Sequence, residues 1–414
     1  MRIARQATAA DDLVGSKDGR GGPSLINDLL TQPSGLPSCE RPEAVQTMKL
    51  WGGMNVHILV IFDLSPPWLA RIRQLRFDAL PTELQWKSIE SEAATMNFLN
   101  SKGLPVPKAY LPARDISDNP AFCFVERVDG TPCGAPFQAD EPFAEEVVRE
   151  LAAFYAKLSD LSFSAVGSLY PSDTGEVQVG PLVDLQYCSS QPPRFFGPFK
   201  TAKQRFLAII DDLFQVIEDG LIPGADGVLL YLTQLEVRDL ALASKRLEGD
   251  DDCGYYIKHA DDKGDNVLRD GEGNIVGVID WEWAYTTSKG DAFAAPYGLT
   301  ENWLYSRGGE RSNDMNKYEL VLIAAYEELG RPVLADCVRR GKFYQRLNDC
   351  LCQHPDFSSL DSLRHAAIGT RYPQRTLEEW EEAMFKKFGG HEGLRKVREA
   401  SAAAMSLERD QDVS

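Results

Sequence analysis

Two stretches of the sequence decide the fold: HADDKGDNVL at residues 259–268 and GVIDWE at residues 277–282. In the first, His259, Asp261 and Asn266 follow the spacing His-x-Asp-x-x-x-x-Asn, which puts a carboxylate and an amide five residues apart. In the second, Asp280 follows Asn266 by fourteen residues, across short segments rich in strand-forming side chains. A β-hairpin after Asn266 would fold the chain back, so that Asp280 could face the same point.

Such a set of side chains suits phosphoryl transfer to a hydroxyl group. One carboxylate orients or deprotonates the attacking hydroxyl, while an amide and a second carboxylate hold Mg²⁺ against the nucleotide phosphates. Oxygen ligands of this kind are those that Mg²⁺ prefers. Each residue alone has a structural alternative, because Asp261 could cap backbone N–H groups, Asn266 could stabilise a turn and Asp280 could cap a helix. The inference therefore rests on the joint pattern.

The chain before this region alternates strands with a single helix. Residues 1–24 lack sustained periodicity and predict a disordered tail, and residues 24–31 predict a short helix. The expected strands are residues 45–50, 56–62, 68–72, 108–110 and 121–128, and the expected helix is residues 89–100. This is the order of a kinase small lobe, so we expect a first domain at residues 25–128.

Beyond Gly130 the pattern becomes mostly helical. The expected helices are residues 144–159, 203–217 and 229–247, followed by short strands at residues 255–258, 266–269 and 275–280. Residues 302 to about 405 are again helical, interrupted at Gly and Pro. We therefore expect a larger second domain at residues 129–407 and a frayed acidic tail at residues 408–414.

The combined pattern resembles the aminoglycoside phosphotransferase and choline kinase-like family, in a branch common among fungal members. The resemblance extends to Phe163, Gly167-Ser168-Leu169 and Gly180-Pro181-Leu182. It implies an α+β, protein-kinase-like fold of two lobes, with a small antiparallel sheet in the N-lobe and a larger, mostly helical C-lobe. It also implies that Asp261 is the catalytic base, that His259 buttresses the loop, and that Asn266 and Asp280 are the Mg²⁺ ligands.

The same resemblance covers the expected small lobe. Gly52-Gly53-Met54-Asn55 is similar to the family's nucleotide loop, although a Gly pair can also form an ordinary hairpin turn. Arg71 stands where the family has its phosphate-contacting cation, and Arg73 projects from the same strand face, so either could pair with Glu92. Glu92 could also be a surface charge. The remaining nucleotide contacts are expected at the hinge, from Glu126 and Val128.

The sequence departs from the family pattern in the catalytic loop. Ala260-Asp261-Asp262-Lys263 replaces a segment in which many relatives have a Gly, a Leu and a His-Pro pair. Asp261, Asp262 and Asp265 also crowd this loop, which could attract a cationic substrate or extend the environment of the metal. Arg71 replaces the Lys of protein kinases. Trp281 and Trp283 are assigned to packing, and Glu282, a neighbour of the metal ligand, is left out of the site because the Trp-Glu pair can reflect packing and surface alone.

Composition excludes some classes of partner. The chain has 414 residues and a formal net charge of −18, which argues against binding to nucleic acid. No apolar run approaches the ~18 residues of a membrane span, and the start has no stretch of signal-peptide length. We therefore expect a cytoplasmic protein whose partners are a nucleotide and a small molecule, with no membrane partner.

The expected function is Mg²⁺-dependent transfer of the γ-phosphate of ATP or GTP to a hydroxyl of a small molecule. A small acceptor is favoured because residues 281–299 contain no Ala-Pro-Glu-like element of a protein-kinase activation segment. Two alternatives stay open: a catalytically inactive, kinase-like binding or scaffold protein, and a nucleotide-using enzyme of secondary metabolism with changed chemistry. The acceptor and the oligomeric state are left open.

Overall fold

The computed structural model describes residues 44–51, 54–62, 65–74, 80–112, 121–134, 144–184, 193–222, 226–249, 254–300, 310–351, 355, 357–369 and 375–412. The chain divides into two compact units. The first, called the sheet unit, comprises Met1–Gly130, Tyr170–Val177 and Val276–Glu282. The second, called the helical unit, comprises Thr131–Leu169, Gln178–Ile275 and Trp283–Ser414.

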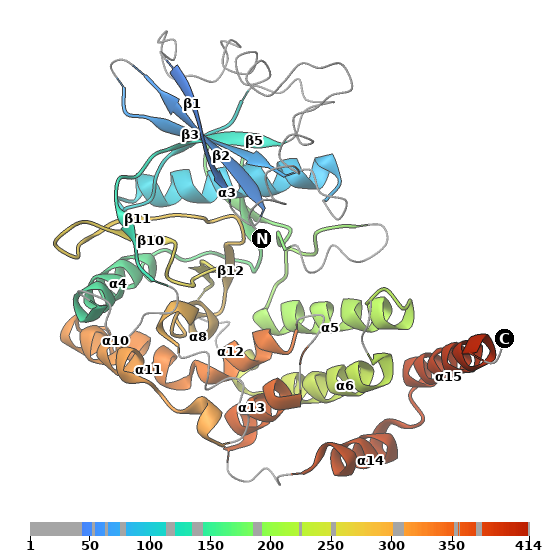
Figure 1. The fold of residues 1–414 in the computed structure, drawn as a ribbon. Helices are drawn as coiled ribbons and strands as arrows, with labels where there is room; N and C mark the ends of the chain where they lie inside the picture. The colour runs from blue at the N-terminus through green and yellow to red at the C-terminus, as the bar shows by residue number, and fades with distance from the viewer. Residues whose placement is uncertain are drawn as a thin grey trace, which may run out of the picture. The chain divides into compact units, whose positions relative to one another are not determined.

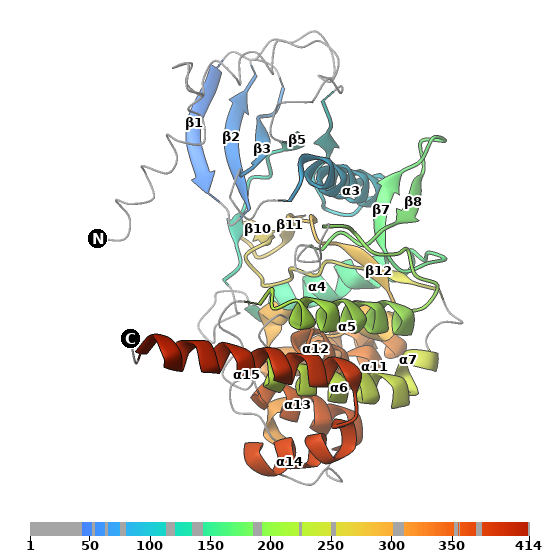
Figure 2. The same ribbon diagram turned by 90° about the vertical axis from the view of Figure 1, so that its right-hand side faces the viewer.

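The sheet unit is built on one antiparallel sheet. Its strands are β1 (Ala44–Trp51), β2 (Asn55–Ile61), β3 (Trp68–Arg73), β4 (Ala109–Tyr110) and β5 (Phe122–Glu126), in the order β1-β2-β3-β5-β4. Helix α3 (Thr82–Ser101) contacts β4 and β5, and Figure 2 shows it beside the row of strands. Aromatic side chains of the sheet pack against each other: the Trp68 ring stacks on the Tyr110 ring, with the ring centroids 4.4 Å apart. The predicted strands of this region are confirmed.

Helix α3 starts earlier than the sequence analysis predicted. The expected span began at residue 89, whereas the helix begins at Thr82, directly after Pro81. Pro at a helix start is favourable because its missing N–H would have no intrahelical partner there. The first turns bury the polar side chains of Gln85 and Ser88 beside Trp86, so their apolar period is broken and the sequence pattern does not reveal them.

The helical unit contains most of the helices. They are α4 (Ala144–Leu158), α5 (Ala202–Glu218), α6 (Gly227–Ala243), α7 (Arg246–Gly249), α8 (Lys289–Ala292), η4 (Tyr297–Leu299), η5 (Glu310–Asn313), α10 (Lys317–Glu328), α11 (Pro332–Arg340), α12 (Lys342–Asp349), α13 (Phe357–Ile368), α14 (Leu377–Phe388) and α15 (Glu392–Asp412). Helices α5 and α6 pack side by side, as do α10 and α11 (Figure 1). The helical prediction for this region is confirmed, and α15 continues to Asp412, inside the segment expected to be frayed.

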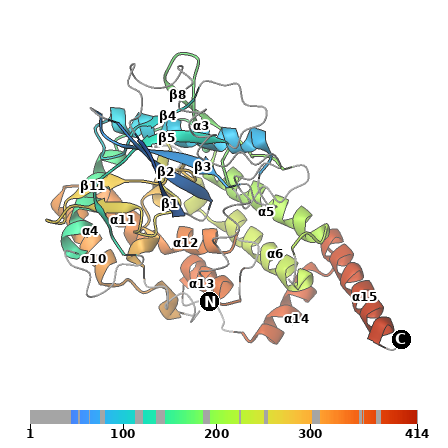
Figure 3. The same ribbon diagram turned by 45° about the horizontal axis from the view of Figure 1, so that its top comes forward.

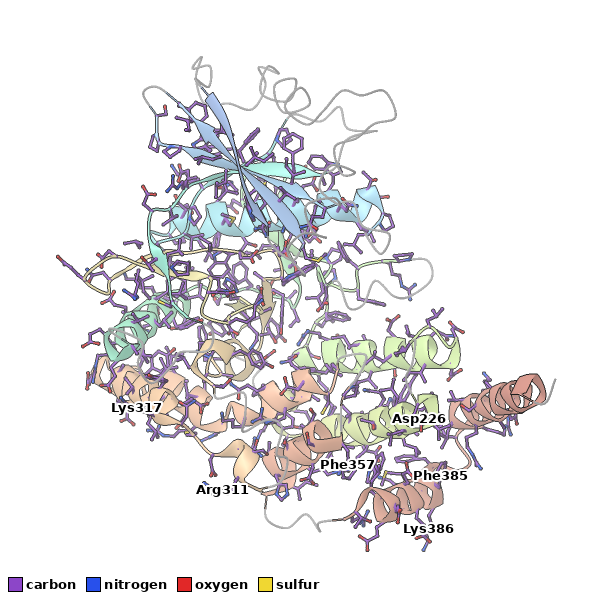
Figure 4. All side chains as sticks on the ribbon, viewed as in Figure 1. Asp226, Arg311, Lys317, Phe357, Phe385 and Lys386 are labelled. Carbon is purple, nitrogen blue, oxygen red and sulfur yellow. The ribbon has the colours of Figure 1, made fainter. Side chains whose placement is uncertain are left out.

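A buried charged pair joins three of these helices. Arg364 of α13 donates two hydrogen bonds, of 2.8 and 2.7 Å, to the carboxylate of Glu236 on α6. The indole N–H of Trp380 on α14 donates to the same carboxylate, and the Arg364 guanidinium lies over the ring of Phe357, at 5.0 Å. Phe357 is labelled at the start of α13 in Figure 4. Helix α15 packs against α5 and α6 before it leaves them towards the C-terminus (Figure 3).

Short strands hold the loops of this region. Strand β6 (Thr131–Pro132) pairs with β10 (Val267–Arg269), β12 (Tyr285–Thr287) pairs with β9 (Tyr256–Lys258), and β7 (Ser168–Pro171) pairs with β8 (Val177–Gly180). Strand β11 (Ile275–Val278) ends two residues before the predicted end at Asp280. The reason is that Asp280 has a φ of 68°, which no strand contains.

The α+β class predicted from the sequence is confirmed, because antiparallel strands dominate one unit and helices the other. The predicted helix at residues 24–31 and the predicted tail at residues 1–24 lie outside the described residues. Among the helices of the described ranges, none combines the length and the hydropathy needed to cross a membrane.

Candidate active site

The segment at residues 259–266, which the sequence analysis predicts to be the catalytic loop, closes on itself around a buried histidine. Strand β9 ends at Lys258, so His259 follows directly, and its side chain is buried. The backbone N–H of Asp261 donates to His259 Nδ1 at 3.3 Å, and Asn266 Nδ2 lies 3.5 Å from the same nitrogen. Asn266 Nδ2 also donates to the carbonyl of Asp261. Hydrogen bonds with His259 and Asn266 therefore hold the backbone of the loop at Asp261.

This closure needs an unusual backbone conformation at Ala260. Its φ of 68° lies in the left-handed region, which costs a residue with a Cβ roughly 1–2 kcal/mol. The turn there lets the carboxylate of Asp261 remain one-quarter exposed, where Lys263 Nζ lies 3.0 Å from its Oδ1. A strained residue next to a partly exposed carboxylate is an arrangement often found at catalytic sites.

We expect Ala260→Gly to raise the free energy of unfolding by up to about 1 kcal/mol, because glycine has no Cβ to strain in the left-handed region. The matched control is Ala402→Gly on the exposed part of α15, where loss of helix propensity lowers stability by about 1 kcal/mol. Urea denaturation of both variants measures the two changes. Equal losses of stability would contradict the strain at Ala260.

In the sheet unit, Arg71 gathers three carboxylates around one guanidinium. It projects from β3 towards α3, where its Nε lies 3.1 Å from Glu92 Oε2. Its Nη2 lies 2.5 Å from Asp280 Oδ1 and 2.9 Å from Glu282 Oε2. Arg71 therefore forms the ion pair with Glu92, a point left open by the sequence. Glu92 is buried, which removes the alternative of a surface charge.

Glu282 is the second centre of this cluster. Its Oε2 accepts from Arg73 Nη1 at 2.9 Å and from Asn55 Nδ2 at 2.8 Å, in addition to Arg71. The side chain is almost fully buried. Glu282 was left out of the predicted site, whereas in the structure it lies at the junction of β2, β3 and the segment after β11. Its position two residues after Asp280 was the available signal.

The cluster contains more acidic than basic side chains. It contains the three carboxylates Glu92, Asp280 and Glu282 against the two guanidiniums Arg71 and Arg73. Burial raises the pKa of Glu92 to about 7, helped by Glu282 and Asp280 and opposed by Arg71. Burial lowers the pKa of Arg71, but the three carboxylates outweigh it and raise that pKa well above its usual range. The raised pKa lets Glu92 take up a proton near neutral pH, and the ring Nε2 of His57 also lies 3.0 Å from Arg71 Nη1.

The predicted metal ligands offer suitable donor atoms. The Asp280 side chain is about one-third exposed (36%), so its carboxylate is accessible to a cation. Asn266 commits its amide nitrogen to the Asp261 carbonyl, which leaves the amide oxygen as the atom that it can offer. Both are the hard oxygen donors that Mg²⁺ takes. Within the described ranges, no three His, Cys, Asp or Glu side chains form a group that could hold a metal.

The predicted hinge residues are held by their own neighbours. Glu126, at the end of β5, accepts from the backbone N–H of Lys108 at 3.1 Å and from the Tyr110 hydroxyl at 3.0 Å. Burial, then this bond to Glu126, raises the pKa of Tyr110 to about 12. A Cβ at Gly277 would meet Val128 Cγ1 at 2.7 Å, so Val128 packs closely on that glycine.

The predicted nucleotide loop is described only in part. Gly52 and Gly53 lie outside the described residues, whereas Asn55 begins β2 and is held by Glu282. In the sheet unit the structure thus brings Asn55, Arg71, Glu92 and Asp280 together. In the helical unit it brings His259, Asp261 and Asn266 together.

Comparison with known families adds a match over half of the chain. The family model described as "Phosphotransferase enzyme family" matches residues 75–288, a span that includes both the 259–266 loop and Asp280. This confirms the resemblance predicted from those residues. Among curated proteins, "Altered inheritance of mitochondria protein 9, mitochondrial" of Debaryomyces hansenii is 35% identical over 118 residues, which are 26% of this chain and 18% of that protein. The chain thus matches less than a fifth of that relative's length.

Several solved structures are similar to this chain at low identity. A thermostable mutant of aminoglycoside phosphotransferase APH(4)-Ia, solved with AMP-PNP and hygromycin B, is 17% identical with a TM-score of 0.45, covering 79% of this chain and 96% of that one. The ethanolamine kinase of Plasmodium vivax is 14% identical with a TM-score of 0.44, covering 84% and 85%. The gentamicin complex of APH(2")-IIa is 12% identical with a TM-score of 0.48, covering 85% and 97%.

Proposed function

The chain belongs to the phosphotransferase enzyme family, and from that premise we propose that it transfers the γ-phosphate of ATP or GTP to a hydroxyl group of a small molecule. In this transfer the bond between the γ-phosphorus and the bridging oxygen breaks, and a bond from the acceptor oxygen to phosphorus forms. The nucleoside diphosphate leaves, and the acceptor hydroxyl loses its proton.

Asp261 is the residue proposed to receive that proton. Its carboxylate is partly exposed, while the backbone on both sides of it is held by His259 and Asn266. A base fixed in this way orients the attacking hydroxyl without the entropy cost of a mobile side chain. Lys263 Nζ lies 3.0 Å from Oδ1 of this carboxylate.

Asn266 and Asp280 are proposed to hold Mg²⁺, to which they offer an amide and a carboxylate oxygen. When bound, the ion neutralises charge that develops on the nucleotide phosphates. Arg71, kept in place by Glu92 and Glu282, would contact phosphate oxygens, with Asn55 and the Gly52-Gly53 loop beside it. Glu126 and Val128 would border the base through their backbone groups.

One observation carries this proposal: the buried guanidinium of Arg71 lies 2.5 Å from the carboxylate of the proposed metal ligand Asp280. A phosphate group bound with Mg²⁺ needs a cation and a metal-binding carboxylate within reach of the same oxygens. If Asp280 only capped a helix, nothing would require its carboxylate to pair with a buried arginine that also contacts Glu92 and Glu282.

The direct test incubates the protein with ATP or GTP, Mg²⁺ and a panel of neutral and cationic small-molecule alcohols. Mass spectrometry of the acceptors then separates addition of a phosphate from addition of a nucleotidyl group. Phosphate addition that requires Mg²⁺ supports the proposal. Nucleotidyl addition would favour the enzyme with changed chemistry, and the absence of nucleotide binding would favour the inactive scaffold protein.

A cytoplasmic location stays a prediction.

A further inference from the structure

Asp262, the residue after the proposed base, makes two hydrogen bonds to one neighbouring segment. Its carboxylate Oδ1 accepts from the backbone N–H of Tyr297 at 3.1 Å. Its main-chain carbonyl accepts from the backbone N–H of Gly298 at 2.8 Å. Both donors belong to the single turn η4 (Tyr297–Leu299). The loop next to Asp261 is therefore bonded to a segment that lies more than thirty residues further along the chain.

The two segments also touch without room for a side chain. A Cβ built on Gly298 would lie 2.8 Å from the backbone of Lys263 and of Gly264. Any other residue at position 298 would have to push the catalytic loop away. Gly264 itself has a φ of 101°, so the loop turns sharply at the point of contact.

The η4 segment is anchored in turn to a helix. The Tyr297 hydroxyl donates to Asp349 Oδ1 of α12 at 2.8 Å and lies 3.4 Å from the Gln345 carbonyl. Arg346 Nη1 lies 3.4 Å from the other carboxylate oxygen of Asp349. A continuous line of bonds thus leads from α12 through Tyr297 to Asp262.

We propose that Asp262 is a positioning residue, which fixes the loop that carries Asp261 by bonding it to Tyr297 and Gly298. The inference rests on the proposed function of Asp261. It gives one of the three loop acids a supporting role, because Asp262 Oδ1 accepts the backbone N–H of Tyr297. It also gives a physical role to one residue of the segment in which this loop departs from the family pattern, because the Asp262 carboxylate holds η4.

Asp265 provides the matched comparison. It lies in the same loop, carries the same charge and is exposed to solvent. If the loop acids acted through their summed charge, removing the charge of Asp262 or of Asp265 would have similar effects. If Asp262 acts as a hydrogen-bond acceptor, asparagine should replace it, because the amide oxygen accepts the same N–H.

The experiment compares Asp262→Asn, Asp262→Ala and Asp265→Asn with the unchanged protein in two measurements. The first is hydrogen exchange of the peptide that contains residues 296–300. The second is Mg²⁺-dependent transfer of phosphate from ATP to the acceptor found in the panel, analysed as kcat and KM. We expect Asp262→Ala to speed exchange at Tyr297 about five- to tenfold. We expect it to lower kcat about 10- to 100-fold with little change in KM.

Asp262→Asn and Asp265→Asn should both stay near the unchanged protein in exchange and in turnover. The proposal is overturned if Asp262→Ala exchanges and turns over like the unchanged protein, or if Asp262→Asn loses as much as Asp262→Ala. Should the unchanged protein transfer phosphate to no acceptor of the panel, the proposed function fails, while the exchange measurement still decides whether Asp262 holds η4. Asp262→Asn keeps that readout available if the alanine variant does not fold.

Discussion

Asp261→Asn should reduce phosphoryl transfer at least about 100-fold, because an amide cannot accept the proton of the acceptor hydroxyl. The substitution keeps the shape of the side chain and the backbone bonds from Asp261 to His259 and Asn266. It removes one ion pair with a largely exposed lysine, which is worth little to stability. Transfer is measured as labelled phosphate appearing on the acceptor found in the panel, and folding by circular dichroism.

Lys263→Gln is the control for this prediction. It removes the same ion pair from the other side and leaves the carboxylate in place, so it should retain far more transfer than Asp261→Asn. Transfer by a folded Asp261→Asn protein at the unchanged rate would remove Asp261 from the role of base.

The largest expected effect on stability belongs to Glu282→Ala, which should lower the free energy of unfolding by about 3–5 kcal/mol. The substitution takes one buried acceptor from Arg71, Arg73 and Asn55 together. Buried guanidiniums that lose a carboxylate partner bear a desolvation cost which the partner had offset. The measurement is urea denaturation followed by tryptophan fluorescence.

Two further variants serve as controls for the Glu282→Ala prediction. Glu282→Gln keeps an oxygen acceptor without the charge and should lose less stability than Glu282→Ala. Glu272→Ala removes an exposed carboxylate from the turn after β10 and should change stability by less than about 0.5 kcal/mol. A loss at Glu282 no larger than that at Glu272 would show that the cluster does not depend on Glu282.

Much of the fold follows from the sequence because its elements are strongly periodic. The strands at residues 45–50, 56–62 and 68–72 alternate or carry β-branched residues, and they match β1, β2 and β3 within two residues. The start of α3 escaped prediction because its first turns bury polar residues such as Gln85 and Ser88. Burial of a polar side chain is decided by a partner elsewhere in the chain, and a local window contains no sign of that partner.

In the site too, some features follow from the local sequence and others depend on distant partners. The spacing of His259, Asp261 and Asn266 predicts that the three residues share one loop. In the structure, hydrogen bonds join them. The left-handed backbone conformation at Ala260 and Asp280 could not be predicted from the sequence, because neither residue is glycine. The roles of Glu282 and Asp262 depend on contacts with Arg73 and Tyr297, residues distant in sequence. Their identity as acids is visible in the sequence, but their partners are set by the tertiary fold.

The proposed metal and nucleotide site that includes Asp280 is tested by calorimetry of ATP binding with and without Mg²⁺. The comparison is between the unchanged protein and Asp280→Asn, because asparagine tolerates the φ of 68° at this position better than alanine does. We expect Mg²⁺ to strengthen ATP binding to the unchanged protein and the substitution to remove this effect. Binding of neither ATP nor GTP, or binding to which Mg²⁺ and Asp280 make no difference, would contradict it.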